Sequence, residues 1–352
     1  MTTSESSAGL VQTVLGLVRP EDLGHTSTHE HLLIDLQFMF QPPEEASERH
    51  RADEPVTLRN LGRVRYNPST NRDNLRLLDE ETAISEALLF KQAGGGTIVD
   101  ATTIGAGRDP LALARIARAT GLHIILGAGY YVGASHPAGM DHKSESEIAE
   151  EIIADITRGV GDTGVRAGII GELGCSWPLT ENERKVLQAG AQAQRQTGAA
   201  ILIHPGRNQA APMEIISLLA EAGADISRVI MSHLDRTIAD IKVLLELAGT
   251  GCYLEYDLFG WECSNYTLSD MDMPNDTQRI GFVQRLIAEG HRDQVVMAQD
   301  VCYKHRLTMY GGEGYGHILE HIVPRMRQKG LPQEDINTIL VANPARVLPL
   351  NV

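Results

Sequence analysis

Short strand-like runs that alternate with helical patterns along almost the whole chain restrict its fold more than any other feature. Seven apolar runs cover residues 96–102, 122–127, 167–172, 199–204, 228–233, 251–256 and 294–300, and the polar stretch 25–31 supplies an opening strand. Short strands separated by helices of roughly 10–15 residues are typical of βαβ units and of a parallel sheet. Eight of them in 352 residues favour an α/β fold of the closed (β/α)8 type, the TIM barrel, over an open doubly wound sheet.

Capping residues locate several of the helices between these strands. Asp109 can cap a helix that ends at Gly121. Thr180 and Glu183 have the spacing of a capping box, which predicts that a helix begins there. A further helix is expected over residues 79–93, just before the second strand.

Two segments depart from the plain repeat. Residues 35–78 are rich in Pro, Arg and Asn, and residues 257–277 carry several acidic and aromatic side chains. We interpret both as elaborated loops at the C-terminal mouth of the barrel. No linker or low-complexity tract divides the chain, so residues 1–352 are expected to form one domain, with residues 1–8 frayed.

The balance of charge excludes several classes of partner. Lys and Arg total 31 against 46 Asp and Glu, a formal net charge of −15 that repels phosphate backbones, so no nucleic-acid partner is expected. The four cysteines form no CxxC pair, which is typical of reduced thiols in a cytoplasmic protein. No apolar run approaches the roughly 18–20 residues of a membrane span, and the first residues lack a signal-peptide pattern, so no membrane association or secretion is expected.

Residues typical of metal ligands stand where the expected strands end. Five of the eight strands end in such residues, which are His29, His31, Glu172, His204, His233 and Asp300. The active site of a (β/α)8 barrel lies at the C-terminal ends of its strands, so these side chains should share one rim. Because residues i and i+2 of a strand point to the same face, His29 and His31 can both aim at one ion while Glu30 faces away.

Four imidazoles and two carboxylates are more ligands than one tetrahedral zinc ion would use. They divide between two ions with one bridging carboxylate, and two ions about 3.5–4 Å apart can hold a hydroxide and polarise the bond to be broken. We expect two divalent ions, with Zn²⁺ as the first choice and Mn²⁺, Co²⁺ or Fe²⁺ as alternatives. A lone histidine at a strand end is more often a core or rim residue, but this many at one rim favour a site.

Long motifs along the chain resemble a known family. They are THEH, GGGTIVDATT, GIIGELGCSWPLTE, IHPGRN, MSHLDRT, CYLEYDLFG, MYGGEGYGHIL and NPARVL. Through them the chain resembles the phosphotriesterase branch of the amidohydrolase superfamily, and within it the phosphotriesterase-related proteins. The resemblance implies a (β/α)8 barrel with a binuclear metal centre and hydrolase activity. For that group it further implies hydrolysis of a linear amide, N-acetyltaurine, to taurine and acetate, a step in taurine metabolism.

Carried over position by position, the resemblance assigns the metal-ligand roles to His29, His31, Glu172, His204, His233 and Asp300. The first two histidines and the aspartate would hold the more buried ion, and the other two histidines the outer one. Glu172 takes the bridging place that a carboxylated lysine has in many superfamily members. Gln299 stands where relatives often have histidine, and Leu173 replaces an isoleucine, but neither is a ligand.

The resemblance also suggests the catalytic residues. A hydroxide shared by two ions, which Glu172 would bridge, would attack the acetyl carbonyl. Asp300 would accept the hydroxide proton and deliver it to the leaving nitrogen. Two divalent ions carry about +4, and these two carboxylates and the hydroxide carry about −3. The mouth is left with a charge of about +1, which suits a small anionic N-acyl substrate. The resemblance suggests a homodimer as the assembly.

Several side chains near the expected strand ends are candidates for binding the anionic end of such a substrate. Arg207 and Arg236 each follow a candidate ligand histidine by three residues, and Arg offers a planar fork of N–H groups. Tyr130 and Tyr131 follow the third strand. Weaker candidates after the last strand are Tyr303, His305 and Arg306. For each of them, rim packing or a surface ion pair is an equal alternative.

Two other functions remain open at this point. The same ligands would serve a lactonase or a phosphotriester hydrolase, because one metal-hydroxide chemistry suits all three. A non-catalytic, metal-stabilised binder of small molecules is a second alternative, although the presence of every ligand is unfavourable to it. An H-x-x-E-H motif at residues 317–321 matches a zinc-peptidase signature, but it lies on an expected outer helix, so we interpret its histidines as core or surface residues.

Overall fold

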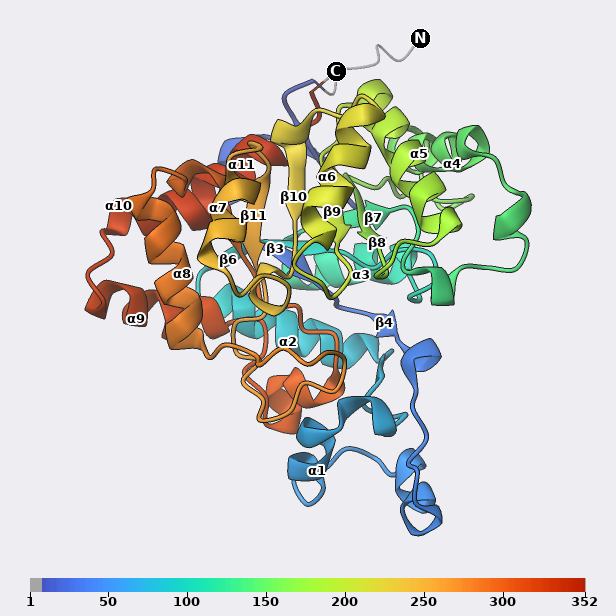
Figure 1. The fold of residues 1–352 in the computed structure, drawn as a ribbon, viewed down its shortest axis with the longest axis vertical. Coiled ribbons are helices and arrows are strands. Elements are labelled where there is room, and N and C mark those ends of the chain that lie inside the picture. Colours follow the sequence, from blue (N-terminus) through green and yellow to red (C-terminus); the bar gives the residue numbers. More distant parts are fainter. Residues whose placement is uncertain (1–7, 352) are drawn as a thin grey trace.

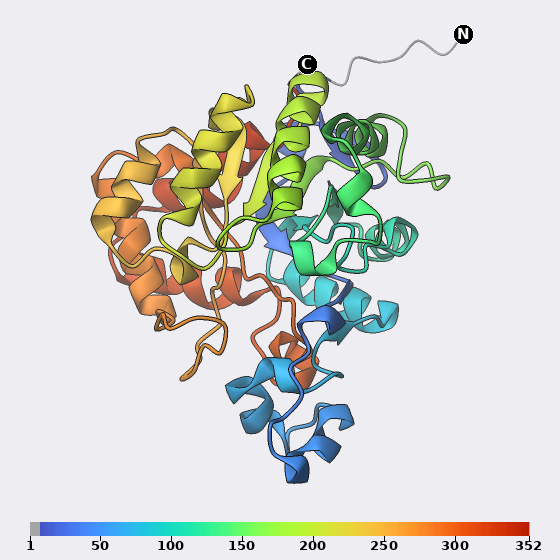
Figure 2. The ribbon, with the colours of Figure 1, turned by 45° about the vertical axis from the view of Figure 1, so that its right-hand side comes forward.

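The computed structural model describes residues 8–351 and contains one sheet of eight parallel strands, in the order β12-β11-β10-β9-β8-β7-β6-β3. The strands are β3 (His25–Glu30), β6 (Gly95–Asp100), β7 (His123–Ala128), β8 (Ile169–Gly174), β9 (Ile201–His204), β10 (Val229–Met231), β11 (Tyr253–Tyr256) and β12 (Val295–Met297). Helices surround the sheet (Figures 1 and 2), and its two edge strands, β3 and β12, lie in contact. The predicted (β/α)8 barrel is confirmed.

The seam between β3 and β12 closes the barrel without a regular ladder among the described strands. The Asp300 N–H donates to the His29 carbonyl oxygen at 3.1 Å. The Thr28 hydroxyl donates to the Met297 carbonyl oxygen at 3.3 Å. These bonds hold the first strand against the last, so that the side chains at the two strand ends face one another.

The helices outside the barrel are α2 (Glu80–Gln92), α3 (Pro110–Thr120), α4 (Glu145–Thr157), α5 (Glu181–Thr197), α6 (Ala211–Glu221), α7 (Ile241–Ala248), α8 (Asp276–Ala288), α9 (Val323–Gln328), α10 (Gln333–Asn337) and α11 (Asn343–Val347). Their predicted caps are present. The Asp109 side chain accepts from the N–H of Ala112, the third residue of α3, and the helix ends at a left-handed Gly121. Thr180 and Glu183 form the reciprocal capping box of α5.

Strand residues alternate between two apolar cores. In β6, Ile98 packs in the outer core between the sheet and the helices, while its neighbour Val99 packs in the barrel interior. A hairpin of β1 (Val11–Thr13) and β2 (Gly16–Val18), which the sequence analysis did not predict, adds Val11 to that interior core. Apolar side chains therefore fill one layer of the barrel interior, and the polar candidates described below lie at the other, C-terminal end.

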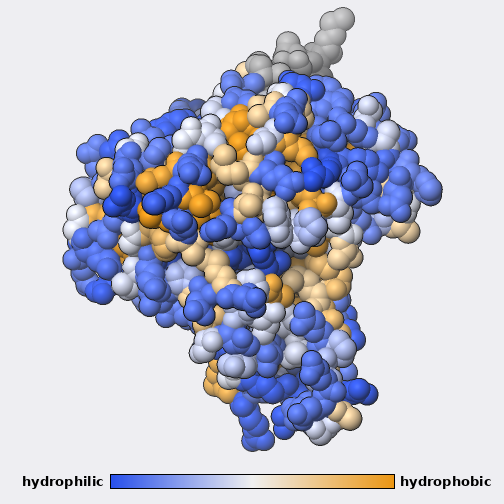
Figure 3. All heavy atoms as spheres, viewed as in Figure 1, coloured by the Kyte–Doolittle hydropathy of each residue, from blue (hydrophilic) through white to orange (hydrophobic). Residues whose placement is uncertain are grey.

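The segment between β4 (Ile34–Asp35) and β5 (Arg76–Leu77) contains α1 (Leu61–Tyr66) and projects from the mouth end of the barrel (Figures 1 and 2). Its surface is largely hydrophilic (Figure 3). Hydrogen bonds join it to the loop after β12: Lys304 pairs with Asp73, and the His305 N–H donates to Asn74 Oδ1. The segment is thus an elaborated loop at the mouth, as predicted.

Two sequence predictions concern features that this structure does not test. The single-domain assignment of residues 1–352 stays a prediction, and residues 1–7 of the expected frayed terminus lie outside the described residues. Among residues 8–351, no helix combines the length and the apolar character needed to cross a membrane.

Candidate metal centre

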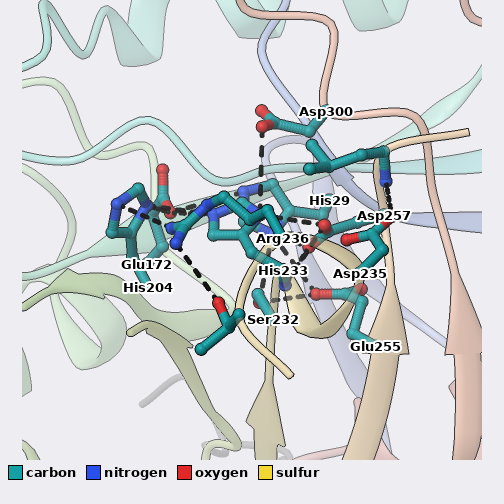
Figure 4. A network of polar contacts seen from close by, with 12 residues as sticks. His29, Glu172, His204, Ser232, His233, Asp235, Arg236, Glu255, Asp257 and Asp300 are labelled. Carbon is teal, nitrogen blue, oxygen red and sulfur yellow. Dashed lines mark hydrogen bonds and ion pairs between the residues drawn. The ribbon is translucent and has the colours of Figure 1, made fainter. Parts of the chain in front are cut away.

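The structure brings the six candidate ligands together at the mouth of the barrel. Three groups of side chains each place one ligand-type atom within 4.8 Å of the others, namely His29 with His31 and Asp300, Glu172 with His204 and His233, and His29 with His233 and Asp257. All of these residues are buried. Figure 4 shows most of them converging from separate strands.

The backbone presents these side chains in different ways. His29 lies in β3, with His31 just beyond it, and the two rings are 5.5 Å apart. Glu172 lies inside β8 and not at its end. His233 and Asp300 stand two and three residues past their strands, with left-handed φ angles of 54° and 47°. Such angles cost a residue with a Cβ about 1–3 kcal/mol, so surrounding contacts must hold them.

Glu172 lies between the two groups of ligands. Its Oε2 is 2.9 Å from Nδ1 of His204, and 3.4 Å from Nε2 of both His233 and His29. Its Oε1 is 3.4 Å from Nε2 of His31. One carboxylate therefore reaches histidines of both groups, which is the arrangement that a bridging ligand requires.

Hydrogen bonds on the far side of two histidine rings leave their inner nitrogens available. The Thr102 hydroxyl donates to a backbone carbonyl and so accepts from Nδ1 of His31 at 2.9 Å. The Nδ1 of His233 lies 2.8 Å from Oδ1 of Asp257, which also accepts the His233 N–H. Each ring thus carries its proton on Nδ1 and directs Nε2 inward, as metal-binding histidines do.

His29 gives the clearest sign that something is to be bound. Its Nδ1 lies 3.2 Å from the Ser232 hydroxyl and 3.3 Å from carboxylate oxygens of Glu255 and Asp257. Its Nε2 is buried and makes no hydrogen bond among the described residues, and its one charged neighbour is Glu172 Oε2 at 3.4 Å. A buried polar atom without a hydrogen bond is costly, and a metal ion shared with Glu172 would satisfy it.

His204 is oriented by an arginine. The Arg236 guanidinium donates to Nε2 of His204 at 3.0 Å and to the Pro205 carbonyl oxygen at 3.2 Å. Because arginine only donates, Nε2 must accept, and the ring proton then lies on Nδ1 toward Glu172. The same Nδ1 lies 2.9 Å from Nε2 of His233, so the two rings point at one place.

Burial and neighbouring charges shift the pKa values of this cluster strongly. Burial disfavours a charged His29, but Glu172 and the other carboxylates prevail and raise its pKa well above the usual value. In the same way, despite burial, Asp300 and Glu172 raise the pKa of His31 to about 9. Burial raises the pKa of Asp257 well above its usual range, and Glu255 adds to this. The pKa values of His204 and His233 shift the other way, because burial lowers both well below the usual value and the Arg236 charge adds to this.

A small chamber lies over the cluster. Its lining includes His31, His204 and Asp300 from the cluster, together with Arg207, Arg236, Tyr131, Trp261, Tyr266, Cys302 and Tyr303. Arg207 donates through Nε to the Tyr266 hydroxyl at 2.8 Å, and among residues 8–351 its terminal N–H groups have no protein acceptor. The predicted loop of residues 257–277 supplies Trp261 and Tyr266 to this wall.

Other candidates lie away from the chamber. The Tyr130 hydroxyl bonds to Glu151 and Lys143, so Tyr130 is not brought together with Tyr131. Two of the weaker candidates are likewise engaged elsewhere: His305 bonds to Asn74, and Arg306 donates to backbone carbonyls. In the H-x-x-E-H motif, His317 pairs with Asp276 at 2.7 Å and belongs to no group of potential metal ligands among the described residues.

The sequence analysis missed the carboxylates that support the histidines. Glu255 and Asp257 stand at the end of β11, two residues apart, where they contact His29 and His233. The sequence does contain a signal for them, because Glu255 and Asp257 have the same i, i+2 spacing at a strand end as His29 and His31. Asp257 was assigned to the following loop, and Glu255 was not considered.

Comparison with known proteins places the chain among close relatives. The model of the phosphotriesterase family matches residues 9–348. The N-acetyltaurine hydrolase of Mus musculus is 51% identical over 97% of this chain and 99% of its own length, and that of Bos taurus is 50% identical with the same coverage. A resiniferatoxin-binding protein of Rhodobacter sphaeroides, known from a crystal structure, is 34% identical, with a TM-score of 0.94 over 98% of both chains.

The geometry predicts that protein stripped by chelation binds two equivalents of Zn²⁺ and releases protons. Since the pKa of His31 is raised to about 9, the metal-free ring is charged at neutral pH, and an ion must displace its proton. Affinity should therefore rise with pH up to about 9. At a free metal concentration 100 times Kd, stability should increase by about 2.7 kcal/mol for each site that is filled.

Titration calorimetry in two buffers of different ionisation enthalpy measures the stoichiometry and the proton release together. His321→Ala, an exposed histidine of the H-x-x-E-H motif, is the control and should bind as the wild type does. Fewer than two bound equivalents, or an affinity that does not change with pH, would contradict the assignment.

Proposed function

The chain belongs to the phosphotriesterase family, and from that premise we propose that it is a metal-dependent hydrolase that cleaves the linear amide N-acetyltaurine to taurine and acetate. One observation carries this proposal more than any other: a single buried carboxylate, Glu172, reaches histidines of both ligand groups. The curated relatives that are about half identical over nearly the whole chain support the substrate.

In this proposal His29, His31 and Asp300 would hold one ion, His204 and His233 would hold a second, and Glu172 would serve both. Zn²⁺ is the first choice, because imidazole nitrogen and carboxylate oxygen suit it, with Mn²⁺, Co²⁺ or Fe²⁺ as alternatives. When bound, such ions lower the pKa of a water molecule and polarise a carbonyl group. The unpartnered Nε2 of His29 fits this role.

The charges around the cluster are also those that two cations would balance. Buried carboxylates there, among them Glu172, Glu255, Asp257 and Asp300, outnumber the buried guanidinium groups of Arg236 and Arg279. Burying uncompensated negative charge is expensive, and bound divalent cations would offset it.

Asp300 is placed to move a proton. It lines the chamber, and its Oδ1 is 3.3 Å from Nε2 of His31. We assign it the role of accepting a proton from the attacking water and delivering it to the departing taurine nitrogen. Glu172 lies beneath the chamber lining and acts by holding the two groups of ligands at a fixed separation.

For the sulfonate we propose Arg207 as the main anchor, because it lines the chamber and its terminal N–H groups have no protein acceptor among the described residues. Arg236 is largely satisfied by His204 and Pro205. If Nδ1 of His204 binds an ion, the ring proton moves to Nε2. Nε2 could then no longer accept from Arg236, whose N–H groups would turn toward another acceptor, and Arg236 lines the chamber. Tyr131 lines the same chamber, and Tyr130 is left out of the proposal.

A lactonase or phosphotriester hydrolase that uses the same centre is the first rival, and a non-catalytic binder is the second. The half-buried Arg207 favours an anionic substrate over neutral lactones and triesters. A homodimer and a cytoplasmic location stay predictions.

The proposal predicts acetate release from N-acetyltaurine by the purified protein. Release should stop after chelation and return when Zn²⁺ or Mn²⁺ is added. It should be faster than the hydrolysis of N-acetyl amino acids, lactones or a phosphotriester. No release by protein with two bound ions would reject the substrate, and preferred turnover of a lactone or triester would favour the first rival.

Asp300→Asn should leave the fold intact and lower kcat by about 10²–10⁴, because the amide cannot accept the proton. Metal content must be measured in parallel, since Asp300 is also a candidate ligand. Asp155→Asn is the control: it removes a carboxylate from α4 that pairs with Arg108, away from the chamber, and should keep kcat within about twofold. If the Asp300 variant retains both ions and wild-type kcat, the proton-transfer role is wrong.

Arg207→Gln should lower kcat/KM for N-acetyltaurine by about 10–100-fold, mostly through KM, because a charge-assisted hydrogen bond to the sulfonate is lost. N-ethylacetamide, which lacks the sulfonate, should lose little. Arg184→Gln on α5 removes a surface pair with Glu214 of α6 and is the matched control. Equal losses for the charged and the neutral amide would show that Arg207 does not bind the anion.

A further inference from the structure

One side chain bridges the seam of the barrel at the metal cluster. Glu30 lies between His29 and His31 in sequence, points away from them, and is fully buried. Its Oε1 accepts the Gln299 N–H at 2.9 Å, and its Oε2 accepts the Val301 N–H at 2.9 Å. The carboxylate of the first strand thus receives both peptide N–H groups that flank Asp300.

The Asp300 N–H between them donates to the His29 carbonyl oxygen at 3.1 Å. Three consecutive N–H groups after β12 therefore bond to two consecutive residues of β3. This matters because Asp300 has a φ of 47°, a conformation that a residue with a Cβ adopts only when its surroundings impose it. The bonds from Glu30 provide that constraint on both sides of the residue.

Further contacts fix the Glu30 carboxylate itself. Its Oε1 also accepts from the Ser27 hydroxyl and from the Gln299 side-chain amide, each at 2.7 Å. The other end of the Gln299 amide accepts the Ile318 N–H at 3.3 Å. Gln299, the position noted as a departure from related sequences, thus has both amide atoms engaged, and it links the seam to the segment that follows.

We propose that Glu30 is a positioning residue for the metal centre: its carboxylate, held across the seam, fixes the turn that presents Asp300 to His29 and His31. The inference rests on the proposed metal centre, and it adds a role that the ligands themselves do not explain. Glu30 does not line the chamber and makes no hydrogen bond to a candidate ligand side chain, so its direct bonds to this turn are those to the backbone on either side of Asp300.

Glu30→Gln tests the proposal with the smallest change of shape. The amide oxygen can serve the three donors at Oε1, but the amide nitrogen then faces the Val301 N–H, and one side of the Asp300 turn is released. Glu86→Gln is a closely matched control. Glu86 is also buried, and its two oxygens accept two backbone N–H groups, those of Thr308 and Met309, away from the chamber.

For the Gln variant at position 30 we expect a 10–100-fold loss of affinity for the more tightly held Zn²⁺, measured by competition with a chromophoric chelator. With N-acetyltaurine, kcat should fall by a similar factor while KM stays within about threefold, since Arg207 is untouched. Glu86→Gln should lower the melting temperature to a similar extent and leave Zn²⁺ affinity and kcat within about twofold.

Glu30→Asp keeps the charge on a shorter side chain and should recover part of the Zn²⁺ affinity. It also keeps the proposal testable if Glu30→Gln folds poorly. If the Glu30 and Glu86 variants lose only stability, and to the same extent, the positioning role is overturned. The Zn²⁺ measurement needs no substrate. A wild type that binds two ions but does not cleave N-acetyltaurine would therefore reject the proposed substrate and leave this inference testable.

Discussion

The contact of one buried carboxylate, Glu172, with histidines from three strands is the interaction on which the mouth of the barrel depends. Charged groups buried this deeply are stable only when they are paired or bound to an ion. Two sets of contacts meet this requirement. In the first, imidazole nitrogens converge on the Glu172 carboxylate. In the second, Thr102 and Asp257 bond to the far ring nitrogens and fix which nitrogen faces inward.

The barrel keeps stability and chemistry in separate layers. Apolar residues such as Val99 and Val11 fill one end of the interior, while the polar cluster occupies the C-terminal end. Loops then shape the chamber above the cluster, and the segment 257–277 contributes Trp261, Tyr266 and Leu268 to its wall. Since the same cluster suits several hydrolytic reactions, selectivity must come from chamber residues, and the half-buried Arg207 is the one best placed to select an anion.

Much of the fold and most of the candidate cluster could be predicted from sequence, because both depend on local rules. Capping residues located the helices, and strand ends located the ligand-type residues. Orientation was less predictable. Tyr130 and Tyr131 are adjacent and of the same residue type, so the sequence could not distinguish them. Only Tyr131 lines the chamber, because consecutive side chains point in different directions. Arg207 and Arg236 share one spacing, but only Arg236 is occupied by a histidine and a carbonyl.

The sequence by itself determined the alternation of strands and helices, the barrel, and the types of side chain gathered at its mouth, because periodicity and capping act over a few residues. Only the tertiary structure decided which atoms meet. The support of His29 and His233 by the end of β11, and the bridge from Glu30 to both sides of Asp300, join residues 24 to 271 positions apart. Such contacts depend on barrel closure and register, which no local pattern encodes.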